Sequence, residues 1–239
     1  MTIHWQRKLF VKPLVYFLSN YPLLGIFIGC GILFGLFSQL DLWFSGLFYK
    51  TTTEVGGGFY LKDHFLMVTI YHGTQYLAVI ITLGLGGAFF ASWFPDFSKL
   101  RSQRRRIGYL LLVLILGPGL IVHSVFKDHW GRARPNQIQY FGGSQQFTTA
   151  LTPTNQCGKN CSYVSGHAAV GYYLATFCFV MTRYRRQILQ IGLTVGSLIG
   201  LVRIIQGGHF LSDIVFAFFI VYSVAWFFNK LMIPDRDYH

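Results

Sequence analysis

His209 and Asp213 are the residues whose types and spacing most directly suggest chemistry. They lie four positions apart in RIIQGGHFLSD, the segment from Arg203 to Asp213, and residues four apart share one face of a helix. A carboxylate on one imidazole nitrogen fixes the histidine tautomer and leaves the other nitrogen free to attack or to accept a proton. The pair could instead cap a helix or hold a metal, although no HExxH pattern or further carboxylate cluster accompanies it. Arg203 ends an apolar run, so its charge needs an anionic partner or a wet cavity.

A second polar cluster, Ser165-Gly166-His167, stands where another apolar segment begins. The unpaired amides and the positive end of a helix starting there would attract a phosphate group. Gly166 permits close backbone approach, Ser165 offers a hydroxyl, and His167 could protonate a leaving group. The alternative is an ordinary helix N-cap.

A third cluster, KDHWGRARP, occupies residues 127–135 and follows a long apolar run. Arg134 offers a planar fork for phosphate oxygens, and Lys127 offers a point charge. These cations could also be anchors for anionic headgroups. An oriented histidine, a helix terminus and these cations together favour phosphoryl transfer over the alternative given for each cluster alone.

The elements that must position these clusters are membrane helices. Of the 239 residues, 53% are hydrophobic and 12% are charged, whereas a soluble domain carries about a quarter charged residues. The sequence therefore predicts one all-α, polytopic membrane domain over residues 1–239, and Gly117-Pro118-Gly119 should kink one of its helices. Six apolar segments are long enough to span a bilayer, at residues 14–38, 66–93, 107–126, 164–182, 188–206 and 210–229.

The basic residues indicate orientation rather than nucleic-acid binding, despite the net charge of +12. Most of them lie in short loops on one side of the six segments, above all in KLRSQRRR at residues 99–106. The positive-inside rule places that side, with both termini, in the cytoplasm. The three polar clusters then share the opposite, outer face.

At this point the residues resemble the type 2 phosphatidic acid phosphatase superfamily, which shares its site with vanadium haloperoxidases. Lys127–Pro135 matches the family motif KxxxxxxRP. Residues 164–167 match PSGH except that Val164 replaces proline, and residues 202–213 match SRxxxxxHxxxD except that Val202 replaces serine. Val202 removes a hydroxyl that family members can use on phosphate, so that contact is in doubt.

The resemblance implies a mechanism without metal or cofactor. His209 would attack phosphorus to form a phosphohistidine, with Asp213 orienting the ring. His167 would protonate the leaving oxygen and then activate water. The phosphate oxygens would be held by Lys127, Arg134, Ser165, the Gly166 amide and Arg203.

Within the superfamily, KDHWGRARP, FGGSQQFTTAL and CSYVSGHAA look like the bacterial lipid A 1-phosphatase branch. That resemblance implies removal of the 1-phosphate of lipid A on the periplasmic side of the bacterial inner membrane. Alternatives are hydrolysis of phosphatidylglycerol phosphate or undecaprenyl diphosphate, phosphate transfer between lipids, and a non-enzymatic anion-binding or transport protein. Transporters keep polar residues near mid-membrane, often within related repeats, and neither feature is visible here. The sequence does not indicate an oligomeric state.

The long outer loop from Asn136 to Tyr163 could cover the site or hold a headgroup. Cys157 and Cys161 lie in it, and an oxidising compartment favours a disulfide between them. Arg132, just before this loop, could help to bind a sugar or a second phosphate.

Overall fold

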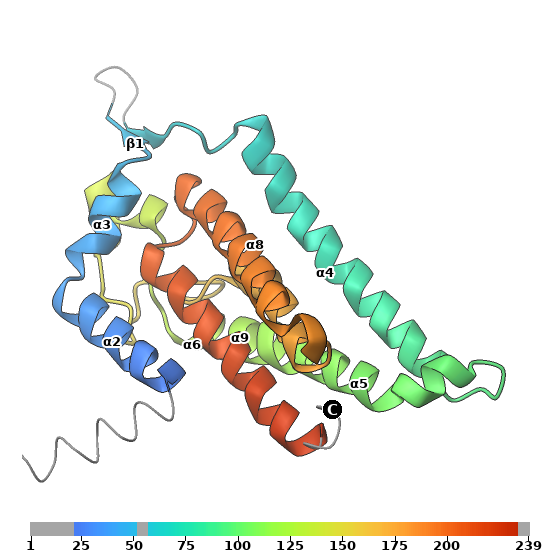
Figure 1. Cartoon of the computed structure of the whole chain (residues 1–239). Coiled ribbons are helices and arrows are strands. Elements are labelled where there is room, and N and C mark those ends of the chain that lie inside the picture. Colours follow the sequence, from blue (N-terminus) through green and yellow to red (C-terminus); the bar gives the residue numbers. More distant parts are fainter. Residues whose placement is uncertain (1–21, 52–56, 234–239) are drawn as a thin grey trace, which may run out of the picture.

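The computed structural model describes residues 22–51 and 57–233 (Figure 1). The chain is mostly helical, with one short antiparallel hairpin of β1 (Tyr49–Lys50) and β2 (Gly58–Phe59). Residues 14–21 of the first expected segment lie outside the described residues. That the whole chain forms a single domain stays a prediction.

Four helices of the described residues are long and apolar enough to cross a membrane, or five if one bent pair counts as a span. They include α4 (Phe65–Ala91), α8 (Arg185–Ile205) and α9 (Leu211–Met232), which confirms the segments at 66–93, 188–206 and 210–229. The fourth runs from Ser98 to His129 and contains the segment at 107–126. Its parts are α5 (Ser98–Leu114), the π-helix η1 (Ile115–Phe126) and α6 (Lys127–His129).

Pro118 does not end this fourth helix. Because proline lacks an N–H, it cannot continue the i→i−4 hydrogen-bond ladder, and here the surrounding stretch adopts the wider π-helical turn of η1. The expected kink at Gly117-Pro118-Gly119 thus takes the form of a π-helical stretch within one continuous helix.

The first and fourth expected segments differ from straight helices. The first breaks into α2 (Pro22–Leu36) and α3 (Gln39–Gly46), which meet at an 80° bend. The fourth, at 164–182, forms only the short α7 (Gly166–Tyr173), followed by the 3₁₀ turns η4 (Leu174–Phe179) and η5 (Thr182–Tyr184). In η4 the Thr176 hydroxyl donates to the Tyr173 carbonyl at 2.7 Å, and such local bonds compete with a regular α-helix. Six straight helical spans are therefore not what the structure contains.

Glycines let α7 and α8 pack in close contact. A Cβ on Gly196 would lie 2.1 Å from the Tyr172 ring, and one on Gly192 would lie 2.2 Å from the Ala175 backbone nitrogen. Small residues at such spacing allow membrane helices to approach closely. This contact brings the start of α7, with His167, beside the end of α8, with Arg203.

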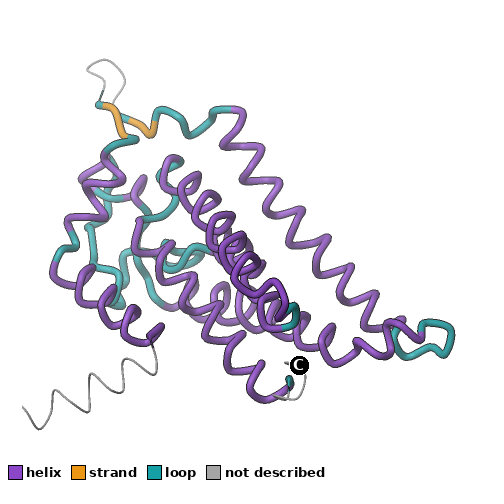
Figure 2. Tube along the Cα trace, in the orientation of Figure 1, coloured by secondary structure: helices purple, strands orange, loops and turns teal. Residues whose placement is uncertain are grey.

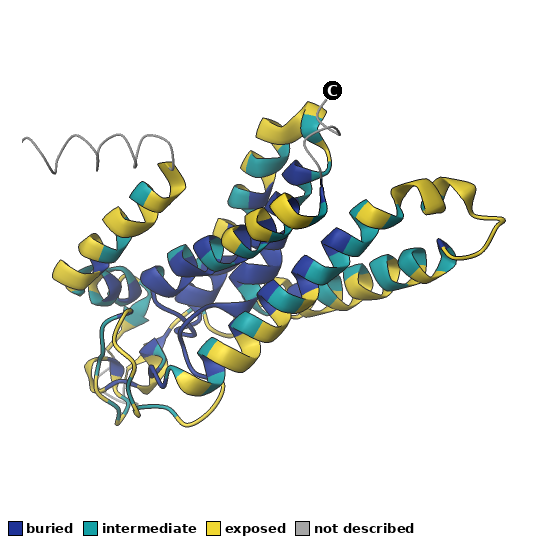
Figure 3. Ribbon diagram, turned by 90° about the horizontal axis from the view of Figure 1, so that it is seen from below, coloured by how far each residue is buried: buried dark blue, intermediate teal, exposed yellow. Residues whose placement is uncertain are grey.

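Helices α7, α8 and α9 form the buried centre of the molecule, and the α4–α5 hairpin projects from it (Figures 1 and 3). Thr74 is the one buried residue of α4, and large apolar side chains of this helix, among them Val79, Ile80 and Leu83, are exposed, as they would be toward lipid. The loops between Trp130 and Ser165 gather at one end of the bundle (Figure 2). They lie there with α6, the beginnings of α7 and α9 and the end of α8, so this end of the bundle holds the three clusters identified in the sequence.

Candidate active site

The His209 imidazole is held in one tautomer by a backbone carbonyl. Its Nδ1 lies 2.7 Å from the carbonyl oxygen of Ser162. Because a carbonyl only accepts hydrogen bonds, Nδ1 must carry the proton, and Nε2 is left with a free lone pair. The side chain is 1% exposed, and this burial lowers the pKa of the imidazole well below its ordinary value. His209 is therefore a neutral base, and the fold defines which of its ring nitrogens keeps a lone pair.

Asp213 acts on His209 less directly than the spacing predicts. Its Oδ2 lies 3.7 Å from His209 Nδ1, which is too long for a hydrogen bond. The same oxygen accepts a hydrogen bond from the Ser162 hydroxyl, and another from the Phe210 amide at 2.8 Å. Asp213 thus anchors Ser162, and the Ser162 carbonyl orients the ring. Spacing alone could not reveal the role of Ser162.

Asp213 belongs to a buried ion-pair network. Arg132 is 0% exposed; its guanidinium donates to Asp213 Oδ1 at 2.6 Å and to Asp41 Oδ2 at 2.8 Å. Burial alone lowers the pKa of Arg132, but the charges of Asp213 and Asp41 outweigh that effect, and its pKa is raised. Arg132 therefore supports the Asp213 carboxylate, which corrects the expectation that it binds a sugar or a second phosphate.

Asp41 joins the network from the far side of the bend between α2 and α3. It is 1% exposed, and its Oδ1 accepts a hydrogen bond from the Ser212 amide at 2.9 Å, in the first turn of α9. A carboxylate there satisfies an unpaired amide and complements the positive end of the helix. Asp41 was not predicted from the sequence. The sequence did offer a signal. Asp41 is an acidic residue at the edge of an apolar segment, in SQLDLW, and the chain has only 8 Asp and Glu residues, so a carboxylate at such a position is unusual.

Three cations predicted to hold phosphate come together around His167. Lys127, Arg134 and Arg203 act electrostatically on its imidazole, and Lys127 also interacts with both arginines. The His167 ring stacks on Tyr71, with centroids 4.4 Å apart. Its Nε2 has no hydrogen-bond partner among the described residues. An unpaired imidazole nitrogen beside cations can exchange a proton with a bound anion.

Ser165 and Gly166 have structural roles beside these cations. The Ser165 hydroxyl accepts a hydrogen bond from the Ala168 amide at 3.3 Å and so caps α7. A Cβ on Gly166 would lie 2.9 Å from His123 Nε2 and 3.3 Å from Lys127 Cε. Gly166 therefore lets His123 and Lys127 pack closely against the start of α7. Phosphate contacts from Ser165 and from the Gly166 amide stay predictions.

The guanidinium of Arg203 lies against Gly208 and over the Tyr71 ring, 4.6 Å from its centroid. The Nη1 of Arg203 donates a hydrogen bond to the side-chain oxygen of Gln206. The Nε of Arg203 is buried and has no hydrogen-bond partner in the described part of the chain. A buried donor without a partner is costly, and a phosphate oxygen would remove that cost.

Gly208→Ala tests the placement of Arg203. The added Cβ would lie 2.2 Å from Arg203 Nη2, and because that atom ends a flexible side chain, the guanidinium should move while the fold persists. We expect the KM for a phosphate substrate to rise about tenfold, the loss of one charged hydrogen bond. The control is Gly84→Ala in α4, where a Cβ meets nothing within 4 Å. Equal KM values for both variants would contradict a phosphate contact by Arg203.

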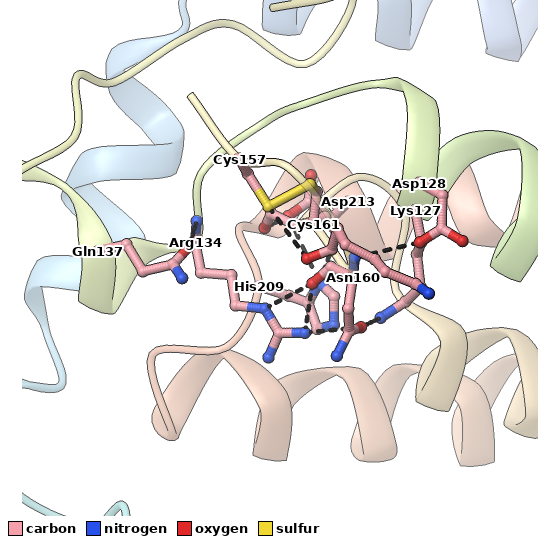
Figure 4. The surroundings of a disulfide bond; sticks show 11 residues. Lys127, Asp128, Arg134, Gln137, Cys157, Asn160, Cys161, His209 and Asp213 are labelled. Carbon is pink, nitrogen blue, oxygen red and sulfur yellow. Dashed lines mark hydrogen bonds and ion pairs between the residues drawn. A yellow bond between two sulfur atoms is a disulfide. The ribbon is translucent and has the colours of Figure 1, made fainter. Parts of the chain in front are cut away.

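The disulfide predicted between Cys157 and Cys161 is confirmed. It lies beside Lys127, Arg134 and His209 (Figure 4). Within the described residues, no group of three or more His, Cys, Asp or Glu side chains is placed to hold a metal ion. Among those residues, His209 and Asp213 are accompanied by no third side chain of these types at metal-binding distance.

Comparisons with known proteins bear on the family to which the chain belongs. The family model of the PAP2 superfamily matches residues 107–236. A lipid A 4'-phosphatase of Francisella tularensis subsp. novicida is 36% identical to the chain, over 87% of this chain and 92% of the relative. A lipid A 4'-phosphatase of Rhizobium leguminosarum is 31% identical, over 86% of this chain and 92% of the relative. One of Rhizobium etli is 28% identical, over 98% of this chain and 95% of the relative. No solved structure matches the chain.

These relatives bear on the branch expected from the loop sequences. All three are named for the 4'-phosphate of lipid A, whereas the loop sequences favoured the 1-phosphatase branch. The superfamily match covers more than half of the chain and includes each of the three polar clusters. The chain therefore belongs to the PAP2 superfamily and is a phosphatase, a phosphoric monoester hydrolase.

Proposed function

We propose that this protein removes the 4′-phosphate of lipid A at the periplasmic face of the bacterial inner membrane. The observation that carries the proposal is the geometry of His209, whose Nδ1 donates to the Ser162 carbonyl and whose Nε2 forms no hydrogen bond with the residues that the structure describes. The choice of the 4′-phosphate over the 1-phosphate follows the names of the relatives. It replaces the branch that the loop sequences favoured.

In the first step, His209 Nε2 attacks phosphorus, an N–P bond forms, and the P–O bond to the lipid breaks. His167 gives its proton to the leaving sugar oxygen. The dianionic phosphate favours the protonated form of His167, because its charge offsets that of the neighbouring cations. In the second step, neutral His167 takes a proton from water, the hydroxide attacks phosphorus, and the N–P bond breaks to release inorganic phosphate.

The three cations stabilise both steps. In phosphoryl transfer, negative charge is spread over three equatorial oxygens. Lys127, Arg134 and Arg203 are already placed before substrate arrives, so little reorganisation accompanies the reaction. This explains why the site gathers positive charge without pairing it with carboxylates.

The length of α4 supports the outward orientation of the site. Tyr71 stacks on His167 near the start of this helix, and Arg104 lies over Trp93 just beyond its end. From Tyr71 to Ala91 the helix rises roughly 30 Å, which is the thickness of the hydrocarbon core. If the basic segment at 99–106 is cytoplasmic, the site lies at the opposite, periplasmic face.

We further propose six crossings with both termini in the cytoplasm. The bent pair α2–α3 would be the first, and α7 with η4 the fourth. The rise of an α-helical and then a 3₁₀ segment from Gly166 to Phe179 is about 24 Å. With its flanking residues, this segment nearly covers the hydrocarbon core. The site ligands are then membrane lipids and their phosphate groups, and no nucleic acid is involved.

The test is phosphate release by purified protein in detergent with excess EDTA. Bisphosphorylated lipid A, phosphatidylglycerol phosphate and undecaprenyl diphosphate are assayed in parallel, and mass spectrometry locates the phosphate left on lipid A. We expect lipid A to lose its 4′-phosphate and to keep its 1-phosphate. Loss of the 1-phosphate, or preference for another lipid, would contradict the substrate. Transfer of labelled phosphate to a second lipid would indicate a transferase, and binding without turnover an anion-binding or transport protein.

A further inference from the structure

Asn160 lies between two of the phosphate-site cations (Figure 4). Its side-chain Oδ1 accepts a hydrogen bond from Lys127 Nζ and another from Arg134 Nη2, each at 2.9 Å. Its backbone carbonyl accepts from Arg134 Nη2 at 2.7 Å and from Nε at 3.3 Å. A single neutral residue therefore bridges Lys127 and Arg134. None of the motifs recognised in the sequence contains it.

The bridge is neutral although the groups that it joins are charged. In the described part of the chain, the ion pairs are Arg132–Asp41, Arg132–Asp213 and His209–Asp213, so neither Lys127 nor Arg134 has a carboxylate partner. Like charges held close together repel one another. The oxygens of Asn160 offset part of this repulsion through hydrogen bonds and leave the net positive charge for an incoming anion.

The bridge is held in place by the short loop that carries it. Asn160 has φ +52°, a left-handed conformation that asparagine tolerates better than most residues. Its amide donates to Asp128 Oδ1 at 3.2 Å. The next residue, Cys161, is 0% exposed, forms a disulfide with Cys157, and donates its amide to the Lys127 carbonyl at 2.8 Å. The loop is thus fixed on both sides of Asn160.

We propose that Asn160 is a positioning residue, which aligns Lys127 and Arg134 as a pair for the phosphate monoester of the substrate. The ligand class rests on the proposed function. Lysine has three N–H donors and arginine has five, so donors remain for phosphate oxygens while Asn160 keeps the two side chains together. The disulfide acts through Asn160 by fixing the loop.

The neutrality of the bridge leads to a sharp test. In Asn160→Asp, a carboxylate would pair with Lys127 and Arg134 and compete with phosphate for both. We expect the KM for the lipid substrate and the dissociation constant for inorganic phosphate each to rise about tenfold or more, with a smaller change in kcat. Asn160→Ala removes the bridge without adding charge, so its KM should rise less.

The matched control is Asn155→Asp, the same change on an exposed residue of the same loop. Its KM and phosphate affinity should stay within about twofold of the unsubstituted protein. Equal constants for Asn160→Asp and Asn155→Asp would overturn the proposal, as would an unsubstituted protein that binds no inorganic phosphate. If no lipid is hydrolysed but only Asn160→Asp loses phosphate binding, the positioning role stands and the proposed function fails.

A double-mutant cycle tests whether the disulfide acts through Asn160. Cys157→Ser opens the loop and leaves Cys161 buried. Residues that act as a unit show non-additive effects. We therefore expect Cys157→Ser to raise the KM, and to raise it no further when combined with Asn160→Ala. Additive effects on the KM would show that the disulfide stabilises the protein without positioning Asn160.

Discussion

Replacement of His209 by alanine is expected to lower kcat for phosphate release by on the order of 10⁴-fold or more, as loss of a nucleophile does in covalent catalysis. The Ser162 carbonyl and the Asp213 carboxylate would remain, but no other described side chain occupies the position of Nε2. The measurement is phosphate release over time, together with trapping of labelled phosphoenzyme in denaturant. A phosphate bound to histidine nitrogen should be lost in acid and kept in base.

The control is His72→Ala, because His72 is exposed on α4 and is not part of the site. It should keep the activity and the labelled intermediate of the unsubstituted protein. Labelled intermediate in His209→Ala, or a loss of activity no greater than in His72→Ala, would place the nucleophile elsewhere. Retained inorganic phosphate binding by His209→Ala would show that the phosphate-site cations are still in place.

Replacement of Arg132 by methionine is expected to destabilise the folded protein more than the same change at any cation of the phosphate site. Methionine fills a similar volume but leaves Asp41 and Asp213 buried without a counter-charge. Removal of one partner from a buried ion pair costs about 3–5 kcal/mol, against a total of about 5–15 kcal/mol for a typical domain. Thermal and denaturant unfolding in detergent should show this loss, and activity should fall with it, because Asp213 no longer holds Ser162 and His209.

Arg134→Met is the matched control, since the same change is made two residues away at a partly exposed side chain. We expect its free energy of unfolding to stay within about 1 kcal/mol and its KM to rise, because Arg134 faces the phosphate site. The two arginines of GRARP would thus differ in role, one supporting the fold around Asp213 and the other binding substrate. Equal unfolding midpoints for the two variants would contradict the role of the buried network.

The sequence by itself determined the membrane class, four of the long helices and the chemical type of the site. Apolar runs of sufficient length have few alternatives to a membrane helix. The three polar clusters, with the spacing of His209 and Asp213, could be recognised because each cluster is a short continuous stretch of sequence. The same holds for Cys157 and Cys161, whose separation along the chain is only four residues.

Only the tertiary structure decided how the groups hold one another. Asp41 and Arg132 are 91 residues apart in the chain, and the Ser162 carbonyl that sets the His209 tautomer is 47 residues from the ring. Such partners depend on how helices pack and bend, so no local pattern reveals them. The physical reason is that spacing specifies which side chains share a helix face, whereas desolvation and long-range hydrogen bonds choose the partners that each charge receives once it is buried.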